Sequence, residues 1–157
     1  MKRLAILLLF GVCFFAAVAQ PVSARQAMDE RGYGAFWERM EKAIESHLKR
    51  PYVWGACGLK SFDCSGFVWR VMYDSGVLIK RTTARKLYMA LPSIPSDQGY
   101  DTGTLVFFNN LKHCGIVANR NMFYHAESSI GTNLSQFDPY WRPKVFGFRS
   151  FPKGPNQ

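Results

Sequence analysis

The stretch Phe62-Asp63-Cys64-Ser65-Gly66-Phe67-Val68 decides how this chain is interpreted. Asp63 is a residue type that caps helix N-termini, and the apolar residues after it recur at helical spacing. The stretch therefore predicts a buried helix from Cys64 to Asp74, ended by Ser75-Gly76. Its first residue would be a cysteine, in a place where unpaired backbone N–H groups and the helix dipole favour negative charge. A thiol there ionises more readily than a free cysteine, and the thiolate is a nucleophile.

Two of the three histidines, His113 and His125, come later in the chain, in strand-like runs that we expect to form a hairpin. The imidazole of His113 would take the thiol proton, and His125 would hydrogen-bond its far nitrogen and fix the tautomer. Alternation along the strand places His113 on one face and Cys114 on the other. We expect the His113 face to be the one that turns toward the Cys64 helix.

Predicted helices come first in the chain, and predicted strands follow. Apolar residues at helical spacing predict an amphipathic helix from Asp29 to Leu48, and Thr82 or Thr83 would cap a short helix through Met89. His47, near the end of the first helix, is expected to be a surface or capping residue. This order predicts an α+β domain. The strand-like runs are Leu105–Phe108, His113–Ala118, Met122–Ala126, Gly131–Phe137 and Val145–Phe151.

Residues 1–24 have the features of a secretory signal peptide. Lys2-Arg3 precede an apolar run, Leu4–Val18, that is shorter than the roughly 20 residues needed to span a bilayer. Small residues allow cleavage after Ala19 or Ala24, and a membrane-anchoring helix is the alternative. We therefore expect an exported protein, periplasmic or extracellular, with one catalytic domain over 25–157 and no stable membrane insertion after cleavage.

Charge and motif content exclude several classes of function. Without Lys2 and Arg3 the chain has 18 basic and 11 acidic residues, a balance that suits anionic surfaces such as cell-wall polymers. The basic residues are scattered, and the protein leaves the cytoplasm, so we expect no nucleic-acid partner. No CxxC pair, HExxH run or phosphate-binding glycine loop is present. We expect neither a metal nor a cofactor, and a monomer.

Three cysteines remain after signal cleavage: Cys57, Cys64 and Cys114. An odd number leaves at least one thiol unpaired in an oxidising compartment. Either Cys57 pairs with Cys114 and Cys64 is free, or nothing pairs, and the sequence leaves both alternatives open. Cys64 has the better site for reactivity in either case.

A series of short motifs, in order along the chain, resembles the NlpC/P60 cysteine peptidases. The similarity runs from about Phe36 to Phe151 and implies a papain-like α+β fold, with the nucleophile's helix packed on an antiparallel sheet. Cys114 and Val117 depart from the family pattern, where Val and Tyr are more usual, and Ala56 stands where a second glycine is common. The motifs are Tyr52-x-Trp54-Gly55, Phe62–Val68, Arg81-Thr82-Thr83-Ala84, Gly103–Phe108, His113-x-Gly115-Ile116 and Tyr124-His125-Ala126.

The resemblance also implies roles for individual residues. Cys64 would be the nucleophile, His113 the general base and then acid, and His125 the group that orients His113. Tyr52 matches a position that lines the site, and Asp63 and Ser65 match positions that help to hold the amine end of the substrate. The implied substrate is the stem peptide of peptidoglycan, cut at the γ-D-glutamyl–diaminopimelate bond or a related D-residue bond through a thioester.

Two other functions stay open on the sequence alone. One is an amidase or acyltransferase of the wider superfamily, with the same thiol chemistry on another acyl group. The other is a non-catalytic cell-wall-binding module in which access to the thiol is blocked.

Overall fold

The computed structural model describes residues 24–151, with side chains placed for all of these except 24–31 and Ser96. The predicted signal peptide lies almost wholly outside the described residues, and the predicted domain limits stay a prediction. No helix in the described part of the chain is both long enough and apolar enough to cross a membrane.

Three α-helices precede the sheet: α1 (Ala24–His47), α2 (Cys64–Asp74) and α3 (Ala84–Ala90). The bounds of α2 are those predicted, and its N-cap Asp63 accepts the Gly66 N–H at 2.5 Å. Thr83 caps α3. Helix α1 begins before the predicted Asp29, because the residues ahead of it include the strong helix formers Ala and Met.

Five antiparallel strands form one sheet in the order β4-β3-β2-β1-β5. All five predicted strands are confirmed, with ends that differ from the prediction by one or two residues at most. The 3₁₀ helices η1 (Ser96–Gln98) and η2 (Arg142–Lys144) were not predicted. The strands are β1 (Leu105–Phe108), β2 (His113–Asn119), β3 (Met122–Glu127), β4 (Gly131–Gln136) and β5 (Val145–Arg149).

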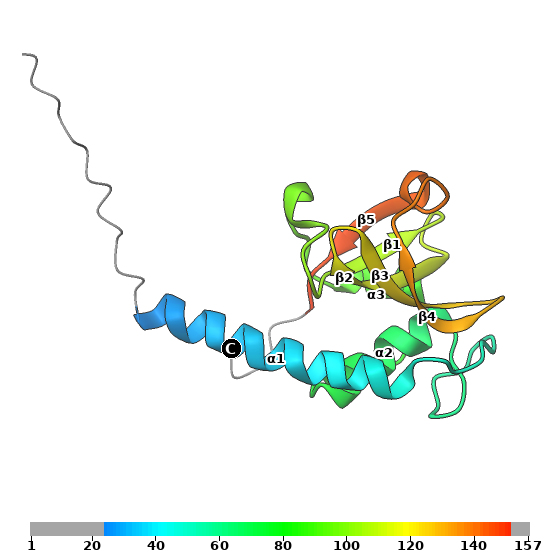
Figure 1. Ribbon diagram of the computed structural model, residues 1–157, viewed down its shortest axis with the longest axis horizontal. Coiled ribbons are helices and arrows are strands. Elements are labelled where there is room, and N and C mark those ends of the chain that lie inside the picture. The colour runs from blue at the N-terminus through cyan, green and yellow to red at the C-terminus, as the bar shows by residue number, and fades with distance from the viewer. Residues whose placement is uncertain (1–23, 152–157) are drawn as a thin grey trace, which may run out of the picture.

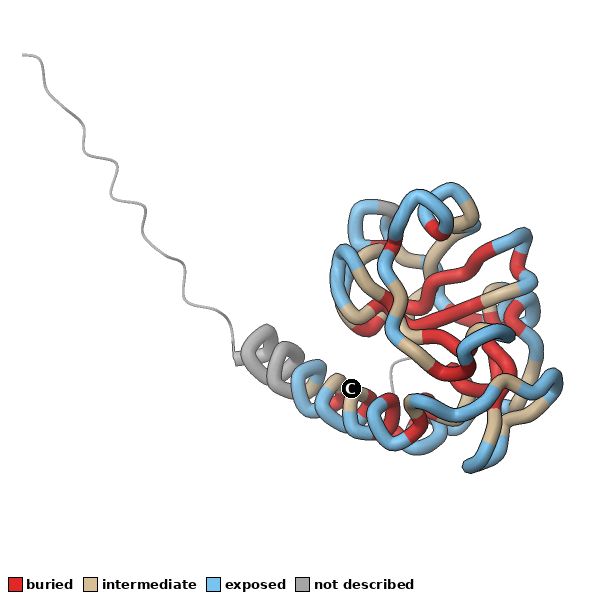
Figure 2. The backbone as a smooth tube through the Cα atoms, turned by 45° about the vertical axis from the view of Figure 1, so that its right-hand side comes forward, coloured by how far each residue is buried: buried red, intermediate tan, exposed pale blue. Residues whose placement is uncertain are grey.

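Both faces of the sheet are covered. Helix α2 packs on β2 and β3, and α1 lies beside α2 on the same side (Figure 1). Cys114 and Ile116 belong to the apolar cluster of this side. The other face carries a second cluster, and Figure 2 shows buried residues running along the strands between these layers. The second cluster consists of Val106, Phe108, Val117, Phe123, Phe137 and Trp141.

This arrangement corrects the predicted orientation of β2. The face that packs on α2 carries Cys114, whereas the His113 ring contacts Phe108 and Trp141 of the second cluster. The prediction was wrong because it assumed one buried face, and here the segment after β4 covers the other face as well. His113 is the first residue of β2 and meets the start of α2 from the end of the sheet.

A side-chain hydrogen bond joins α1 to α2. His47 is 5% exposed, and its Nε2 lies 2.7 Å from Asp74 Oδ2, which also accepts from Arg70. The Thr132 hydroxyl donates to the His47 carbonyl at 2.6 Å and so connects the end of α1 to β4. His47 is therefore a buried structural residue, and its predicted surface location was wrong.

Candidate active site

A loop packed against the start of α2 positions Cys64. The Asp63 N–H donates to the carbonyl of Ala56 at 2.9 Å, and Tyr52 and Cys57 each form a β-bridge with Phe62. A Cβ atom at Gly66 would collide with the Ala56 carbonyl, so the loop reaches the helix this closely because residue 66 is glycine. Cys64 therefore begins α2 at a fixed position beneath the loop.

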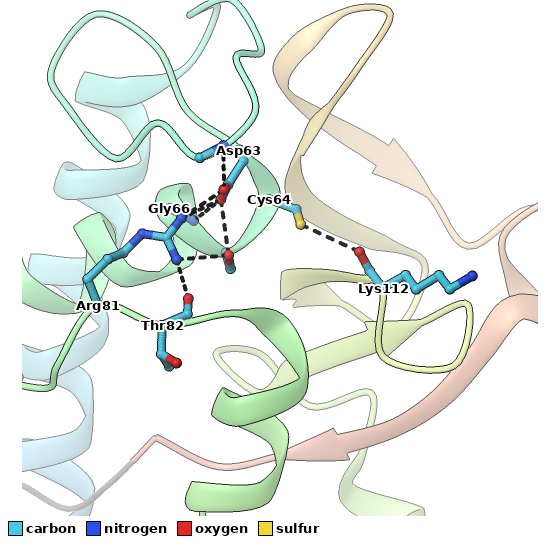
Figure 3. A network of polar contacts seen from close by, with 8 residues as sticks. Asp63, Cys64, Gly66, Arg81, Thr82 and Lys112 are labelled. Carbon is cyan, nitrogen blue, oxygen red and sulfur yellow. Dashed lines mark hydrogen bonds and ion pairs between the residues drawn. The ribbon is translucent and has the colours of Figure 1, made fainter.

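The carboxylate of Asp63 is the centre of a polar network that holds this helix start (Figure 3). Besides capping Gly66, it accepts from the Gly55 N–H at 3.0 Å and from the Ser65 hydroxyl at 3.0 Å. Arg81 Nη2 reaches both of its oxygens at 2.8 Å, and Arg81 Nη1 donates to Ser65 Oγ at 3.0 Å. The Asp63 side chain is only 11% exposed, so a charge-assisted network fastens loop, helix and Arg81 together.

A chain of hydrogen bonds leads away from His113 through β3 and β4. His113 Nε2 lies 2.8 Å from His125 Nδ1, and His125 Nε2 lies 2.9 Å from Ser135 Oγ. Ser135 donates to Asn133 Oδ1 at 2.8 Å, and Asn133 donates to the Gly131 carbonyl at 2.9 Å. The Gly131 carbonyl can only accept, so the Asn133 amide nitrogen donates to it and the Asn133 oxygen accepts from Ser135. Ser135 therefore accepts from His125 Nε2–H, and His125 Nδ1 accepts from His113 Nε2–H. This direction leaves His113 Nδ1 as the nitrogen that can exchange a proton with the thiol.

Trp141 covers the two histidines. Its ring stacks on His113 with centroids 5.4 Å apart and meets His125 edge to face at 5.0 Å. Burial, and next the charge of His113, lower the pKa of His125 to about 3. His125 is therefore neutral at neutral pH, and its Nδ1 can accept the hydrogen bond that His113 Nε2–H donates.

The Cys64 thiol lies 3.9 Å from the Lys112 carbonyl, which Figure 3 shows directed at the sulfur. A hydrogen bond from Cys114 contributes most to lowering the pKa of Cys64 to about 5, and a hydrogen bond and the charge of His113 add to it. Burial and the negative charge of Asp63 oppose this effect. A pKa of about 5 makes Cys64 a thiolate at neutral pH.

All three described cysteines, Cys57, Cys64 and Cys114, carry free thiols, so the alternative without a disulfide describes this structure. Cys57 is partly exposed on the loop before α2, and Cys114, on strand β2, is fully buried. Within residues 24–151, no group of three or more His, Cys, Asp and Glu side chains is arranged to hold a metal ion.

The family model described as "NlpC/P60 family" matches residues 49–150, a span that contains every group of this site. The chain belongs to the NlpC/P60 family. It is 35% identical over 106 residues to the "Probable peptidoglycan endopeptidase LytE" of Bacillus subtilis (strain 168). The matched stretch covers 64% of this chain and 30% of that protein. It is 34% identical over 98 residues to the "Murein DD-endopeptidase MepS/Murein LD-carboxypeptidase" of Escherichia coli (strain K12), with 59% of this chain and 51% of that protein covered.

A solved structure of the same family has a fold similar to that of this chain. A crystal structure described as similar to lipoprotein, NLP/P60 family, from Staphylococcus aureus subsp. aureus Mu50 matches with a TM-score of 0.67 and 26% identity, over 76% of this chain and 42% of that one. The predicted papain-like NlpC/P60 architecture, with the Cys64 helix on an antiparallel sheet, is confirmed. The chain spans no more than about half the length of these relatives.

The structure brings all six predicted site residues of this NlpC/P60 domain to one place. Cys64, His113 and His125 form a continuous line from α2 to β3. Tyr52 forms a β-bridge with Phe62, two residues before the thiol, and burial, and next the charge of Cys64, raise the pKa of Tyr52. Asp63 and Ser65 meet Arg81 rather than open space, and their predicted contact with substrate stays a prediction, as do the catalytic roles.

Four groups of the site were missed from sequence. Ser135 lies on the same face of β4 as Asn133, which pairs with His125, so strand alternation was a usable signal for it. Arg81 lies in a motif of the resemblance and Cys114 departs from one, but neither they nor Trp141 gave a local signal for their partners, which come from distant parts of the chain.

Proposed function

We propose that this chain is an exported cysteine peptidase that hydrolyses the stem peptides of peptidoglycan through a thioester intermediate. The observation that carries the proposal is a cysteine at the start of α2 together with His113, whose far nitrogen begins a directed chain of hydrogen bonds. His113 also helps to lower the pKa of Cys64 to about 5. The relatives named peptidoglycan or murein endopeptidases support the same substrate class for this chain. The proposed bond is γ-D-glutamyl–diaminopimelate or a related bond to a D-residue.

In the first half of the reaction, the Cys64 thiolate attacks the scissile carbonyl carbon. The oxyanion is held by the backbone N–H groups of Cys64 and Ser65 at the start of α2, because Asp63 already accepts those of Gly66 and Phe67. Oxyanion donors of this kind contribute about 3–4 kcal/mol each to the transition state. The His113 imidazolium then gives its Nδ1 proton to the leaving amine, and the carbon–nitrogen bond breaks to leave a thioester on Cys64.

In the second half, His113 acts as a base. It takes a proton from water, whose oxygen attacks the thioester carbon, and Cys64 leaves as a thiolate. At each stage where His113 is cationic, its Nε2–H donates to neutral His125, which passes the polarisation on to Ser135. Trp141 shields these bonds from water and so keeps the imidazole in one orientation.

Digestion of purified sacculi and defined muropeptides tests the proposal. The wild-type chain should release shortened stem peptides, detected by mass spectrometry, whereas Cys64→Ala should release none. Cys57→Ala is the matched control, because Cys57 is a free thiol outside the line of catalytic groups, and it should behave as wild type.

Two outcomes would reject this function. One is the absence of peptide products from walls of both the diaminopimelate and the lysine type. The other is unchanged product release by Cys64→Ala. Turnover of another amide or ester, without muropeptide cleavage, would instead favour an acyltransferase or amidase.

Export is the second part of the proposal. The basic start, the apolar run of residues 4–18 and the small residues before positions 20 and 25 support removal of a signal peptide. Mass spectrometry of the protein recovered from periplasm or medium should give an N-terminus at Gln20 or Arg25. An intact Met1 on the exported protein would contradict cleavage.

A further inference from the structure

We propose that Asn133 is a positioning residue for the histidine of the proposed peptidase. The orientation of its side-chain amide decides which nitrogen of His113 is free to exchange a proton with the thiol. The inference concerns the mechanism of the proposed function and rests on it. Asn133 lies on β4, an edge strand of the sheet (Figure 1), and reaches His113 through Ser135 and His125.

The backbone just before Asn133 is held in one orientation. Gly131 has a φ of +89°, which suits glycine, and a Cβ atom there would collide with the Arg50 carbonyl. The Thr132 N–H donates to that same carbonyl at 2.9 Å, and the Lys49 N–H donates to the Thr132 carbonyl at 2.8 Å. The start of β4 is thus fastened to the segment after α1, which fixes the direction of the Gly131 carbonyl.

This carbonyl sets the way the Asn133 amide points. Asn133 Nδ2 donates to the Gly131 carbonyl at 2.9 Å, and a reversed amide would bring two acceptor oxygens together. In the observed orientation Asn133 Oδ1 faces the Ser135 hydroxyl at 2.8 Å. A hydroxyl has one proton to donate, so Ser135 gives it to Asn133 and offers a lone pair to His125 Nε2, 2.9 Å away.

The two histidines transmit this choice to the thiol. A neutral imidazole has one N–H, so His125 with its proton on Nε2 presents a bare Nδ1 to His113 Nε2 at 2.8 Å. His113 is then the donor, and its Nδ1 is left to accept a proton. If the Ser135 hydroxyl donated to His125 instead, each step would reverse. Neutral His113 would then hold its proton on Nδ1, a tautomer that cannot act as a base toward the thiol.

The other neighbours of His125 do not fix this direction. Glu127 Oε2 lies 3.9 Å from His125 Nε2, beyond hydrogen-bonding distance, so its charge favours a proton on Nε2 without accepting it. Phe123 packs on the His125 ring with centroids 4.7 Å apart and offers no polar group. Asn133, in contrast, is the residue paired with His125 across β3 and β4.

Nuclear magnetic resonance of the full chain, with histidine labelled at its ring nitrogens, tests the proposal without any peptidoglycan. Proton–nitrogen correlations at alkaline pH, where imidazoles are neutral, show which ring nitrogen carries the proton. In the wild type it should be Nε2 in both His113 and His125. Asn133→Leu should change the tautomer ratio by about tenfold or more, because the Ser135 proton loses one acceptor and turns to His125. Asn133→Asp keeps an oxygen for Ser135 and should retain the wild-type tautomers.

Muropeptide cleavage provides the second readout. Asn133→Leu should lower kcat by about twofold or more, in step with the population of the wrong tautomer, and should leave KM unchanged. Gln136→Leu is the matched control, because it removes an exposed side-chain amide from the same strand, and it should change neither kcat nor the tautomers. His47, the third histidine, is an internal reference in every spectrum.

Two results would overturn the inference. One is an unchanged tautomer ratio in Asn133→Leu. The other is an equal change in Asn133→Leu and Asn133→Asp, which would reflect the lost contact with Gly131 and not the lost acceptor. If Asn133→Leu does not fold, as judged by near-ultraviolet circular dichroism, Asn133→Ala replaces it in the same comparison. A wild type that cleaves no muropeptide would reject the proposed function, whereas the spectra, which need no substrate, would still decide the role of Asn133.

Discussion

Removing the guanidinium of Arg81 should destabilise the fold by an amount that the contacts allow us to work out. Arg81→Met deletes the 3.0 Å contact to Ser65 and the two 2.8 Å contacts to Asp63, which dominate because they join opposite charges, and leaves an apolar side chain of comparable length. Hydrogen bonds to charged groups contribute about 1.5–3 kcal/mol each, so the two together are worth about 3–6 kcal/mol. Arg81 Nε is buried without a partner, and relief of that cost returns about 1–3 kcal/mol. The central values of these two ranges, about 4.5 and 2 kcal/mol, give an expected net loss in free energy of unfolding of about 2.5 kcal/mol.

Urea unfolding followed by tryptophan fluorescence measures this loss. With a slope of about 1–3 kcal/mol per molar urea, the midpoint of Arg81→Met should fall by about 1–2 M. Arg120→Met is the matched control: Arg120 is 79% exposed and lies 3.9 Å from Asp101, so its loss should change stability by less than about 0.5 kcal/mol. Adding Asp63→Asn to Arg81→Met should recover part of the loss, because asparagine still caps α2 without a stranded charge. Equal midpoints for the two arginine variants would refute the reasoning.

Three further changes test the site. Since Cys64 takes up a proton as the pH falls through about 5, kcat/KM for muropeptide cleavage should drop along an acid limb centred there; a limb near the ordinary cysteine value of about 8.5 would contradict this. Trp141→Ala should lower kcat by on the order of 10–100-fold by opening the histidine pair to water, while Trp141→Phe keeps most of the activity; equal kcat values would argue against shielding. Gly66→Ala should lower the free energy of unfolding by about 2 kcal/mol or more, whereas Gly32→Ala, in open space on α1, should raise it by about 0.5–1 kcal/mol; thermal unfolding would expose a reversed order.

Most of the fold was predictable because its signals are local. Asp63 as N-cap, the apolar spacing of α2 and the strand alternation each depend on residues within a few positions of one another. The predicted bounds of α2 and the five strands agree with the structure for that reason. The site residues Cys64, His113 and His125 were identified in the same way, from a cap, a hairpin and a motif that resembles a family.

The orientation of groups within the site was not predictable from local pattern. The sequence suggested one buried sheet face, but Trp141 and Phe137 return from after β4 and bury the second, which sends His113 to that side. The partner of Asp63 is Arg81, and nothing in either local pattern identifies the other.

What the sequence by itself determined is the presence of a thiol at a helix start and two imidazoles on a hairpin. What only the tertiary structure decided is which protons those groups hold. Ionisation depends on burial and on the groups that surround a side chain, and the groups that lower the pKa of Cys64 come from β2, which packing of the whole domain brings against α2.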